Sequence, residues 1–175
     1  MINLRINAGN IPANHWVQDP DVGGGRIIGE ACHFIDLCNY LIDEEILSAD
    51  IKSIPVNNKG INSDDNFIIT IKYRDGSLAN IFYTSLGGAK QSKELLEVYY
   101  EGNSFVIDDF INYLQYSKSD KKEIKLKEQD KGRDVQIKEI LKFLQGKPSL
   151  VPNINFDINA SLVAIHSQKM LHGKG

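Results

Sequence analysis

Residues 23–37 of the chain read GGGRIIGEACHFIDL, three glycines followed at once by a pattern that predicts a helix over about residues 26–42. At about 100° per residue, one face of this helix carries apolar side chains, namely Ile28, Ala31, Cys32, Ile35, Cys38 and Ile42. The opposite face carries Arg26, Gly29, Glu30 and His33. We expect the first face to pack on a core and the second to hold candidate functional groups.

The three glycines fit no known nucleotide-binding fingerprint. A dinucleotide fingerprint that starts at Gly23 requires glycine where Ile28 stands, and a P-loop that starts at Gly24 requires lysine where Glu30 stands. Backbone N–H groups at the start of a helix can still bind an anion. The alternative is a flexible segment or a tight turn that leads into the helix, and the sequence leaves both interpretations open.

Glu30 and His33 are candidate acid–base groups, because residues three apart share one face of a helix. A carboxylate beside an imidazole favours the protonated ring and suits proton transfer. The alternative is an exposed ion pair of small energetic value. Cys32, His33 and Cys38 do not project together, and no second ligand cluster occurs, so we expect no metal site.

Upstream of the glycines, residues 2–8 alternate apolar and polar side chains, which predicts a half-buried strand. The loop over residues 9–25 is long, and long ordered loops are often functional. It carries His15, Trp16 and Asp19. Trp16 can stack on a sugar ring or base, or it can anchor the loop on the core.

Downstream, the pattern turns to strands from about residue 50 to residue 127. Asp-Gly at residues 75–76 predicts a hairpin between strands at 66–73 and 77–84. Two more hairpins are expected from 95–100 with 104–108, and from 110–116 with 123–127. Helices at 135–144 and from about residue 155 close the chain. The sequence therefore predicts an α+β fold, an open, mainly antiparallel sheet with helices packed on one face.

The composition excludes several function classes. The chain has 175 residues, 42% of them hydrophobic, and a net charge of −3, which predicts one domain and gives no reason to expect nucleic acid or an anionic membrane as partner. We expect no signal peptide and no segment that spans a bilayer, because the chain has no basic end followed by an apolar run and no apolar stretch of the required length. Cys32 and Cys38 lie about 9 Å apart along the predicted helix, too far for a disulfide, which favours a reducing cytoplasm.

The glycine run with the Cys-His and Ile-Asp-Leu that follow resembles the C-terminal domain of the glucose–fructose oxidoreductase/inositol dehydrogenase (Gfo/Idh/MocA) family. Three other segments are similar to that domain: 5–9 to its first strand, 93–109 to its central hairpin, and 130–132 to the lead into its penultimate helix. The resemblance covers essentially the whole chain. Residues 14–19 also resemble members that are fused to a zinc-type alcohol dehydrogenase module.

The resemblance implies half of a two-domain enzyme. Family members bind NAD or NADP on an N-terminal Rossmann domain, which is absent here, so no cofactor site is expected in this chain. His33 matches the histidine that shuttles a proton during hydride transfer, and the family's aspartate position holds Gly29, one residue before Glu30. The resemblance and the loop chemistry together assign substrate contacts to Asn7, His15, Trp16, Asp19, Arg26, Lys131 and Arg133.

The expected function follows from these assignments. Residues 1–175 are expected to be a single substrate-binding and oligomerisation domain of a cytoplasmic NAD(P)-dependent oxidoreductase that acts on a sugar or nucleotide-sugar. His33, with Glu30, is the expected proton donor or acceptor, and the sheet face is the expected surface of a homo-oligomer. The alternative is a non-catalytic module of the same fold that binds a sugar or a second copy, which Gly29 in place of aspartate favours.

Overall fold

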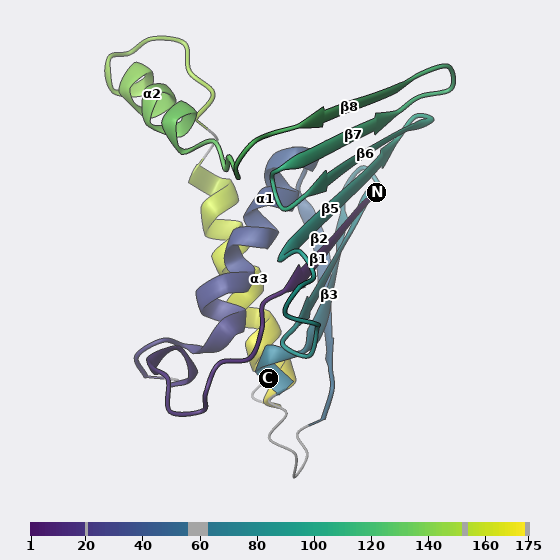
Figure 1. The fold of residues 1–175 in the computed structure, drawn as a ribbon. Coiled ribbons are helices and arrows are strands. Elements are labelled where there is room, and N and C mark those ends of the chain that lie inside the picture. Colours follow the sequence, from purple (N-terminus) through teal and green to yellow (C-terminus); the bar gives the residue numbers. More distant parts are fainter. Residues whose placement is uncertain (20, 56–62, 152–153, 174–175) are drawn as a thin grey trace.

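The computed structural model describes residues 1–19, 21–55, 63–151 and 154–173, which form an eight-stranded sheet with helices on one face (Figure 1). The strand order is β2-β3-β4-β1-β5-β6-β7-β8. The strands are β1 (Ile2–Asn7), β2 (Ile46–Ser53), β3 (Phe67–Tyr73), β4 (Leu78–Thr84), β5 (Glu94–Tyr100), β6 (Asn103–Asp108), β7 (Asn112–Tyr116) and β8 (Lys121–Lys125).

Strand β1 lies in the middle of the sheet, although it comes first in the chain. It pairs parallel with β4 and antiparallel with β5, and the other neighbouring pairs are antiparallel. The predicted mainly antiparallel α+β fold is therefore confirmed, together with the three hairpins. The loop that leaves β1 starts from the centre of the sheet and leads directly to the glycines.

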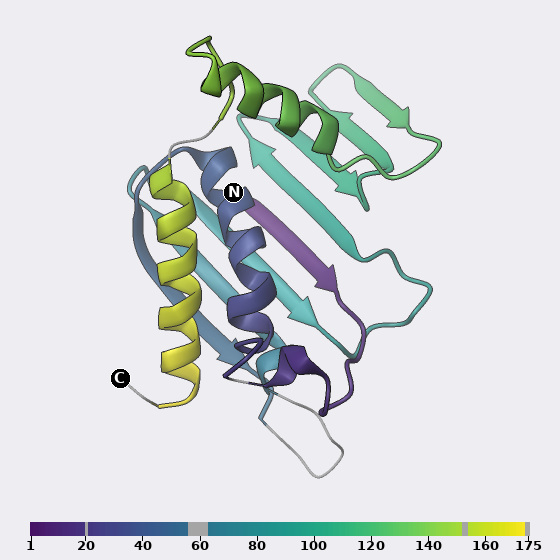
Figure 2. The same ribbon diagram turned by 90° about the vertical axis from the view of Figure 1, so that its left-hand side faces the viewer.

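Two helices cover the half of the sheet that contains β1 to β4 (Figure 2). A short π-helix, η2 (Ile27–Ala31), continues into α1 (Cys32–Ile42), and α3 (Ile154–Leu171) packs beside it. Helix α2 (Arg133–Leu144) lies apart from them, after the connection from β8, and has no buried residue. Two 3₁₀ turns complete the described part: η1 (Trp16–Gln18) and η3 (Ser63–Asp65).

The core lies between this helix pair and the sheet. Strand β3 shows why, since its side chains alternate strictly between buried and exposed, as a half-covered strand requires. The buried members are joined by alternate residues of β1 and β4 and by the inner face of the helix. The main contributors are Leu4, Ile6, Ile35, Cys38, Ile69, Ile71, Tyr73, Ile81 and Tyr83.

The opposite face of the sheet has no helix over it in the described residues. Ile68, Phe82 and Tyr99 point to this side and are 38%, 40% and 47% exposed. Between them, side-chain hydrogen bonds of 2.8 to 3.3 Å run across four strands, linking Thr70, Asn80, Asn3, Glu97 and Tyr99. We call this side the open face.

The start of the helix departs from the prediction. The expected inner positions Ala31, Ile35 and Cys38 are buried, but Ile28 is 37% exposed and Arg26 is fully buried. The predicted places of Ile28 and Arg26 are therefore wrong. The reason is the π-helix, whose wider i→i+5 turn rotates the residues before Cys32 relative to those after it. Such π turns often occur at functional sites.

Candidate functional site

The glycines form a tight turn in which two of the three N–H groups are hydrogen-bonded. The N–H groups of Gly23 and Gly24 both donate to the carbonyl of Asp19, at 2.9 and 3.0 Å. Gly24 and Gly25 have φ of 70° and 77°, which glycine adopts without strain. A Cβ on Gly23 would lie 2.5 Å from the carbonyl oxygen of Trp16. Of the two interpretations from the sequence, the structure favours the tight turn.

Arg26 follows this turn and is the centre of a buried polar network. Its Nη1 donates to the hydroxyl of Tyr83 at 2.8 Å, and its Nη2 donates to the carbonyl of Gly9 at 2.9 Å. Its Nε lies 3.5 Å from Oδ1 of Asp65, a charge contact without hydrogen-bond geometry. Because Arg26 is 0% exposed, the substrate contact predicted for it is not available. Its buried guanidinium instead connects Gly9 of the loop after β1, Tyr83 of β4 and Asp65 of η3.

Asp65 has a second partner that extends the network to the loop after β1. Gln18 Nε2 donates to Asp65 Oδ2 at 2.8 Å. Burial raises the pKa of Asp65, and the Gln18 hydrogen bond and the charge of Arg26 oppose that rise. The 3₁₀ turn that carries Trp16 is therefore tied, through Gln18 and Asp65, to the buried guanidinium.

Glu30 lies one turn after Arg26, and its carboxylate meets the same phenol. The hydroxyl of Tyr83 donates to Glu30 Oε2 at 2.7 Å. The expected Glu30–His33 pair does not form: no hydrogen bond or ion pair joins the two side chains among those that the structure describes. Glu30, the acid predicted to pair with His33, is thus held by Tyr83 of β4, a residue that the sequence analysis did not identify.

His33 lies in the first turn of α1 and its side chain is exposed. The neighbouring charge on its own helix is Asp36, one turn later. The imidazole is therefore open to a ligand that approaches the helix from outside, whereas the carboxylate of Glu30 is half-buried.

Asp36 in turn meets Asp157 at the start of α3. Burial raises the pKa of Asp36 above its ordinary value, the charge of Asp157 and a hydrogen bond with it add to that rise, and the charge of His33 opposes it. Two carboxyl groups in contact repel each other when both are ionised. The α1–α3 contact therefore includes a destabilising pair.

Replacing Asp36 by asparagine is expected to stabilise the protein by about 0.5–1 kcal/mol at neutral pH. A carboxyl group whose pKa is higher in the folded than in the unfolded protein destabilises the fold at pH values where it is ionised. Below the pKa of the unfolded state the group is protonated in both states, and the destabilisation is absent. The gain should therefore disappear as the pH falls below the ordinary aspartate range. Urea unfolding at several pH values measures it, with Asp50→Asn, an exposed aspartate on β2, as the control. A gain that is the same at every pH would contradict the explanation.

Asn7, the last residue of β1, and the loop residues His15 and Asp19 were predicted to bind substrate, and all three make contacts within the fold. Asn7 is 8% exposed, and its Nδ2 donates to the carbonyl of Gly88 at 2.9 Å. His15 Nδ1 accepts from the N–H of Val17 at 3.3 Å. The carboxylate of Asp19 accepts from the backbone N–H groups of residues 21 and 22. These contacts shape the loop.

Trp16 is the member of this group that offers a surface. Its side chain is 63% exposed, so it does not anchor the loop in the core. The imidazole of His15 lies beside it, with 5.8 Å between ring centroids. An exposed aromatic ring with a polar neighbour can stack on the apolar face of a sugar.

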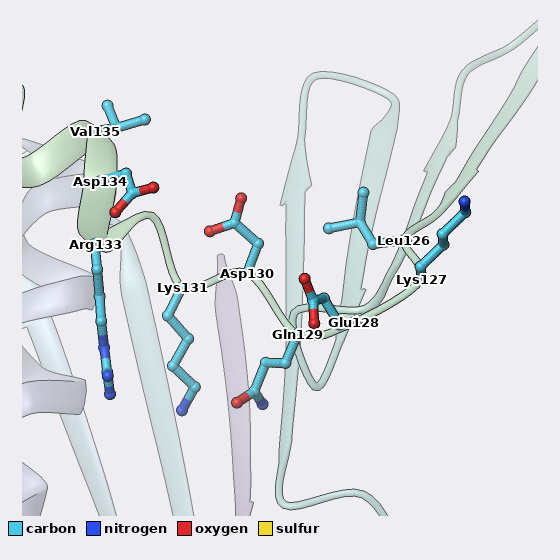
Figure 3. A pocket seen from close by; sticks show the side chains of 9 residues that line it. All are labelled: Leu126, Lys127, Glu128, Gln129, Asp130, Lys131, Arg133, Asp134 and Val135. Atoms are coloured by element: carbon cyan, nitrogen blue, oxygen red, sulfur yellow. The ribbon is translucent and has the colours of Figure 1, made fainter.

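Lys131 and Arg133 lie elsewhere, in a cavity of about 620 Å³ between β8 and α2. In Figure 3 both side chains point to the same side of the connecting segment. Lys131 Nζ lies 2.6 Å from Oε1 of the buried Glu94 and 5.5 Å from the ring centre of Phe110. The cavity is lined by residues 126–131 and 133–135 and includes none of the helix residues discussed above. The predicted site residues thus fall into three groups: helix, loop and cavity.

The sheet has a single parallel pair among the described strands, and the N–H groups of Gly23 and Gly24 donate to the carbonyl of Asp19. No three or more His, Cys, Asp or Glu side chains of the described residues cluster in a way that could hold a metal ion. Within the described part, no helix has the length and hydropathy needed to cross a membrane.

The comparisons with known proteins agree with this fold. The profile of the oxidoreductase family's C-terminal alpha/beta domain matches residues 1–173. No curated protein matches the chain. Solved structures do match it, and the chain spans about half the length of the first of these relatives.

Three solved structures illustrate the likeness. An oxidoreductase domain protein from Kribbella flavida has a TM-score of 0.75 at 13% identity, with 99% of this chain and 57% of that chain covered. An NAD binding oxidoreductase from Klebsiella pneumoniae has a TM-score of 0.72 at 15% identity, with 99% of this chain and 57% of that chain covered. UDP-N-acetylglucosamine 3-dehydrogenase GnnA from Acidithiobacillus ferrooxidans has a TM-score of 0.72 at 12% identity, with 95% of this chain and 51% of that chain covered. The TM-scores establish a shared fold, while the profile match establishes the family. The chain belongs to the Gfo/Idh/MocA oxidoreductase family, as its C-terminal alpha/beta domain.

Proposed function

We propose that this chain is the substrate-binding half of an NAD(P)-dependent oxidoreductase that acts on a CH–OH group of a sugar or nucleotide-sugar. The observation that carries the proposal is the exposed imidazole of His33, one turn from the fixed carboxylate of Glu30 on a helix of the family's domain. The fold shared with a UDP-N-acetylglucosamine 3-dehydrogenase supports the substrate class.

The nicotinamide, bound outside this chain, would supply or accept the hydride in such a reaction. In this chain, His33 takes the proton of the substrate hydroxyl, or returns it in the opposite direction. Glu30 provides a carboxylate one turn away, held by the hydroxyl of Tyr83. Trp16 and His15 pack on the sugar ring, and Lys131 with Arg133 attract its polar or anionic groups.

We also propose that the open face binds a second copy of the chain in a reducing, cytoplasmic setting. Ile68, Phe82, Tyr99 and Tyr116 expose between 38% and 47% of their surface there. A second layer over the uncovered face of a sheet would bury these apolar side chains.

The second candidate is a non-catalytic sugar-binding or dimerisation module of the same fold. The observation in its favour is Gly29, which stands where acid-bearing members of the family have aspartate. This module would keep the loop and cavity contacts and would lose nothing when His33 is replaced.

The first test uses the isolated chain with UDP-N-acetylglucosamine and free N-acetylglucosamine as probes. We expect no NAD(P)-dependent turnover, because residues 1–173 match the C-terminal domain of a family that binds its dinucleotide on the N-terminal domain. We expect amide resonances of His33, Lys131 and the Trp16 indole to shift in ¹⁵N-correlated spectra. Turnover by the isolated chain, or shifts confined to the open face, would contradict the proposal.

A further inference from the structure

We infer that Tyr83, backed by the buried guanidinium of Arg26, is the positioning residue that fixes the carboxylate of Glu30 at the site, an inference that rests on the proposed function. The evidence is a continuous set of contacts. Arg26 and Glu30, one turn apart, both bind the hydroxyl of the same tyrosine, at 2.8 and 2.7 Å.

The direction of these hydrogen bonds is fixed by their chemistry. A guanidinium only donates, so the oxygen of Tyr83 accepts from Arg26. The single hydroxyl proton is then available to Glu30, and a carboxylate only accepts. Arg26 thus determines which way the phenol points, and the phenol determines where Oε2 of Glu30 lies. A bond to an ionised acceptor is short and strong.

Tyr83 remains a donor because it remains protonated. Burial raises the pKa of its phenol well above the ordinary value, and the hydrogen bond and charge of Glu30 add to this rise. The opposing effect of Arg26 is smaller. The hydroxyl therefore binds Glu30 over the whole neutral range.

The ring of Tyr83 is itself held rigidly. It is 1% exposed and stacks on Phe67, with ring centroids 4.8 Å apart and planes 4° from parallel. The ring of Phe34, on α1, has its centroid 6.4 Å from that of Tyr83. The guanidinium carbon of Arg26 lies 5.7 Å from the centroid of the Tyr83 ring. Because β4 is paired on both sides, the hydroxyl has a position set by the sheet.

The π turn explains how one phenol reaches both helix residues. It places Arg26 inward, beneath the surface, while Glu30 stays half-buried at the edge. Oε1 of Glu30 makes no hydrogen bond with any described residue, so this oxygen is the one that can face a ligand or the His33 ring. An acid held at one oxygen and open at the other is suited to orient a neighbouring group.

The chain offers a matched control for the hydroxyl. Tyr73 is also buried, on the neighbouring strand β3, and its hydroxyl donates to Oδ1 of Asn39 on α1 at 2.9 Å. Tyr73→Phe removes a buried sheet-to-helix hydrogen bond without touching Glu30. A purely structural role for Tyr83 predicts the same effect for both tyrosines.

The experiment compares Tyr83→Phe and Tyr73→Phe in the intact oxidoreductase. We expect Tyr83→Phe to lower kcat about tenfold with little change in KM, and to change the pH profile of kcat, because a displaced carboxylate costs rate. Tyr73→Phe should keep kcat and its pH profile. In the isolated chain, the ¹³C resonance of Glu30 Cδ should move in Tyr83→Phe and stay in Tyr73→Phe.

A double-mutant cycle provides the second test. If Tyr83 acts only through Glu30, Glu30→Gln and the double variant Tyr83→Phe/Glu30→Gln have the same kcat. Equal loss in both tyrosine variants, additive loss in the cycle, or an unmoved Glu30 resonance would overturn the inference. Full activity of His33→Ala would instead overturn the proposed function, so the two failures are distinguishable.

Discussion

Replacing Arg26 by methionine is expected to lower the free energy of unfolding by about 3–5 kcal/mol, a large part of the stability of a domain. Methionine fills similar space but has no donor, so the carboxylate of Asp65 loses its charge partner in a buried position. The hydroxyl of Tyr83 and the carbonyl of Gly9 each lose a donor as well. Urea unfolding followed by circular dichroism measures the change.

Two further variants distinguish the effect of losing the buried network from the effect of losing one positive charge. Arg74→Met removes an arginine whose ion pair with Glu45 is exposed, and it should change stability by less than about 0.5 kcal/mol. Asp65→Asn, added to Arg26→Met, removes the unpaired charge and should restore part of the loss. Equal effects of Arg26→Met and Arg74→Met would show that the buried network is not what stabilises the helix start.

Under the proposed function, replacing His33 by alanine in the full-length protein is expected to lower kcat about 100-fold or more, because general acid–base groups contribute rate factors of that size. The side chain is exposed, so the folded domain should keep its stability. Steady-state kinetics with NAD(P) and a sugar substrate measure the rate, and thermal unfolding confirms the fold.

His33→Gln and His166→Ala complete this test. A glutamine side chain can still form hydrogen bonds but cannot transfer a proton. We therefore expect the kcat of His33→Gln to be as low as that of His33→Ala. His166 is an exposed histidine on α3, and its removal should leave the rate unchanged. A rate for His33→Ala within twofold of the unsubstituted enzyme would favour the non-catalytic module.

The patterns that depend on neighbours in sequence were predicted well. Alternation along Phe67–Tyr73, with Asp-Gly two residues beyond it, predicts a strand and a hairpin, and both are confirmed. The start of β2 was predicted less well, since the strand begins at Ile46 and not at about residue 50. Only Ile51 of this strand is buried, so its sequence alternates weakly between apolar and polar residues and gives little signal of where the strand starts. The motif at residues 23–37 predicts a family that the profile match confirms.

The candidate site could be predicted only in part, as the helix residues show. An α-helical period of 3.6 places Arg26 beside His33, but a π turn between them puts one in the core and the other in solvent. No local pattern signals such a turn. Tyr83 was missed because a strand tyrosine that faces inward reads as core, although a buried hydroxyl requires a partner.

The sequence by itself determined the strands, the helix after the glycines, the family and the residue types available for catalysis, because each follows from spacing over a few residues. The tertiary structure alone decided which polar groups meet. Arg26 and Tyr83 are 57 residues apart, and their contact depends on the register of β4 against its neighbours and on the rotation of one helical turn. Buried charges must find partners across such distances, and only the assembled sheet and helix bring those partners within hydrogen-bond reach.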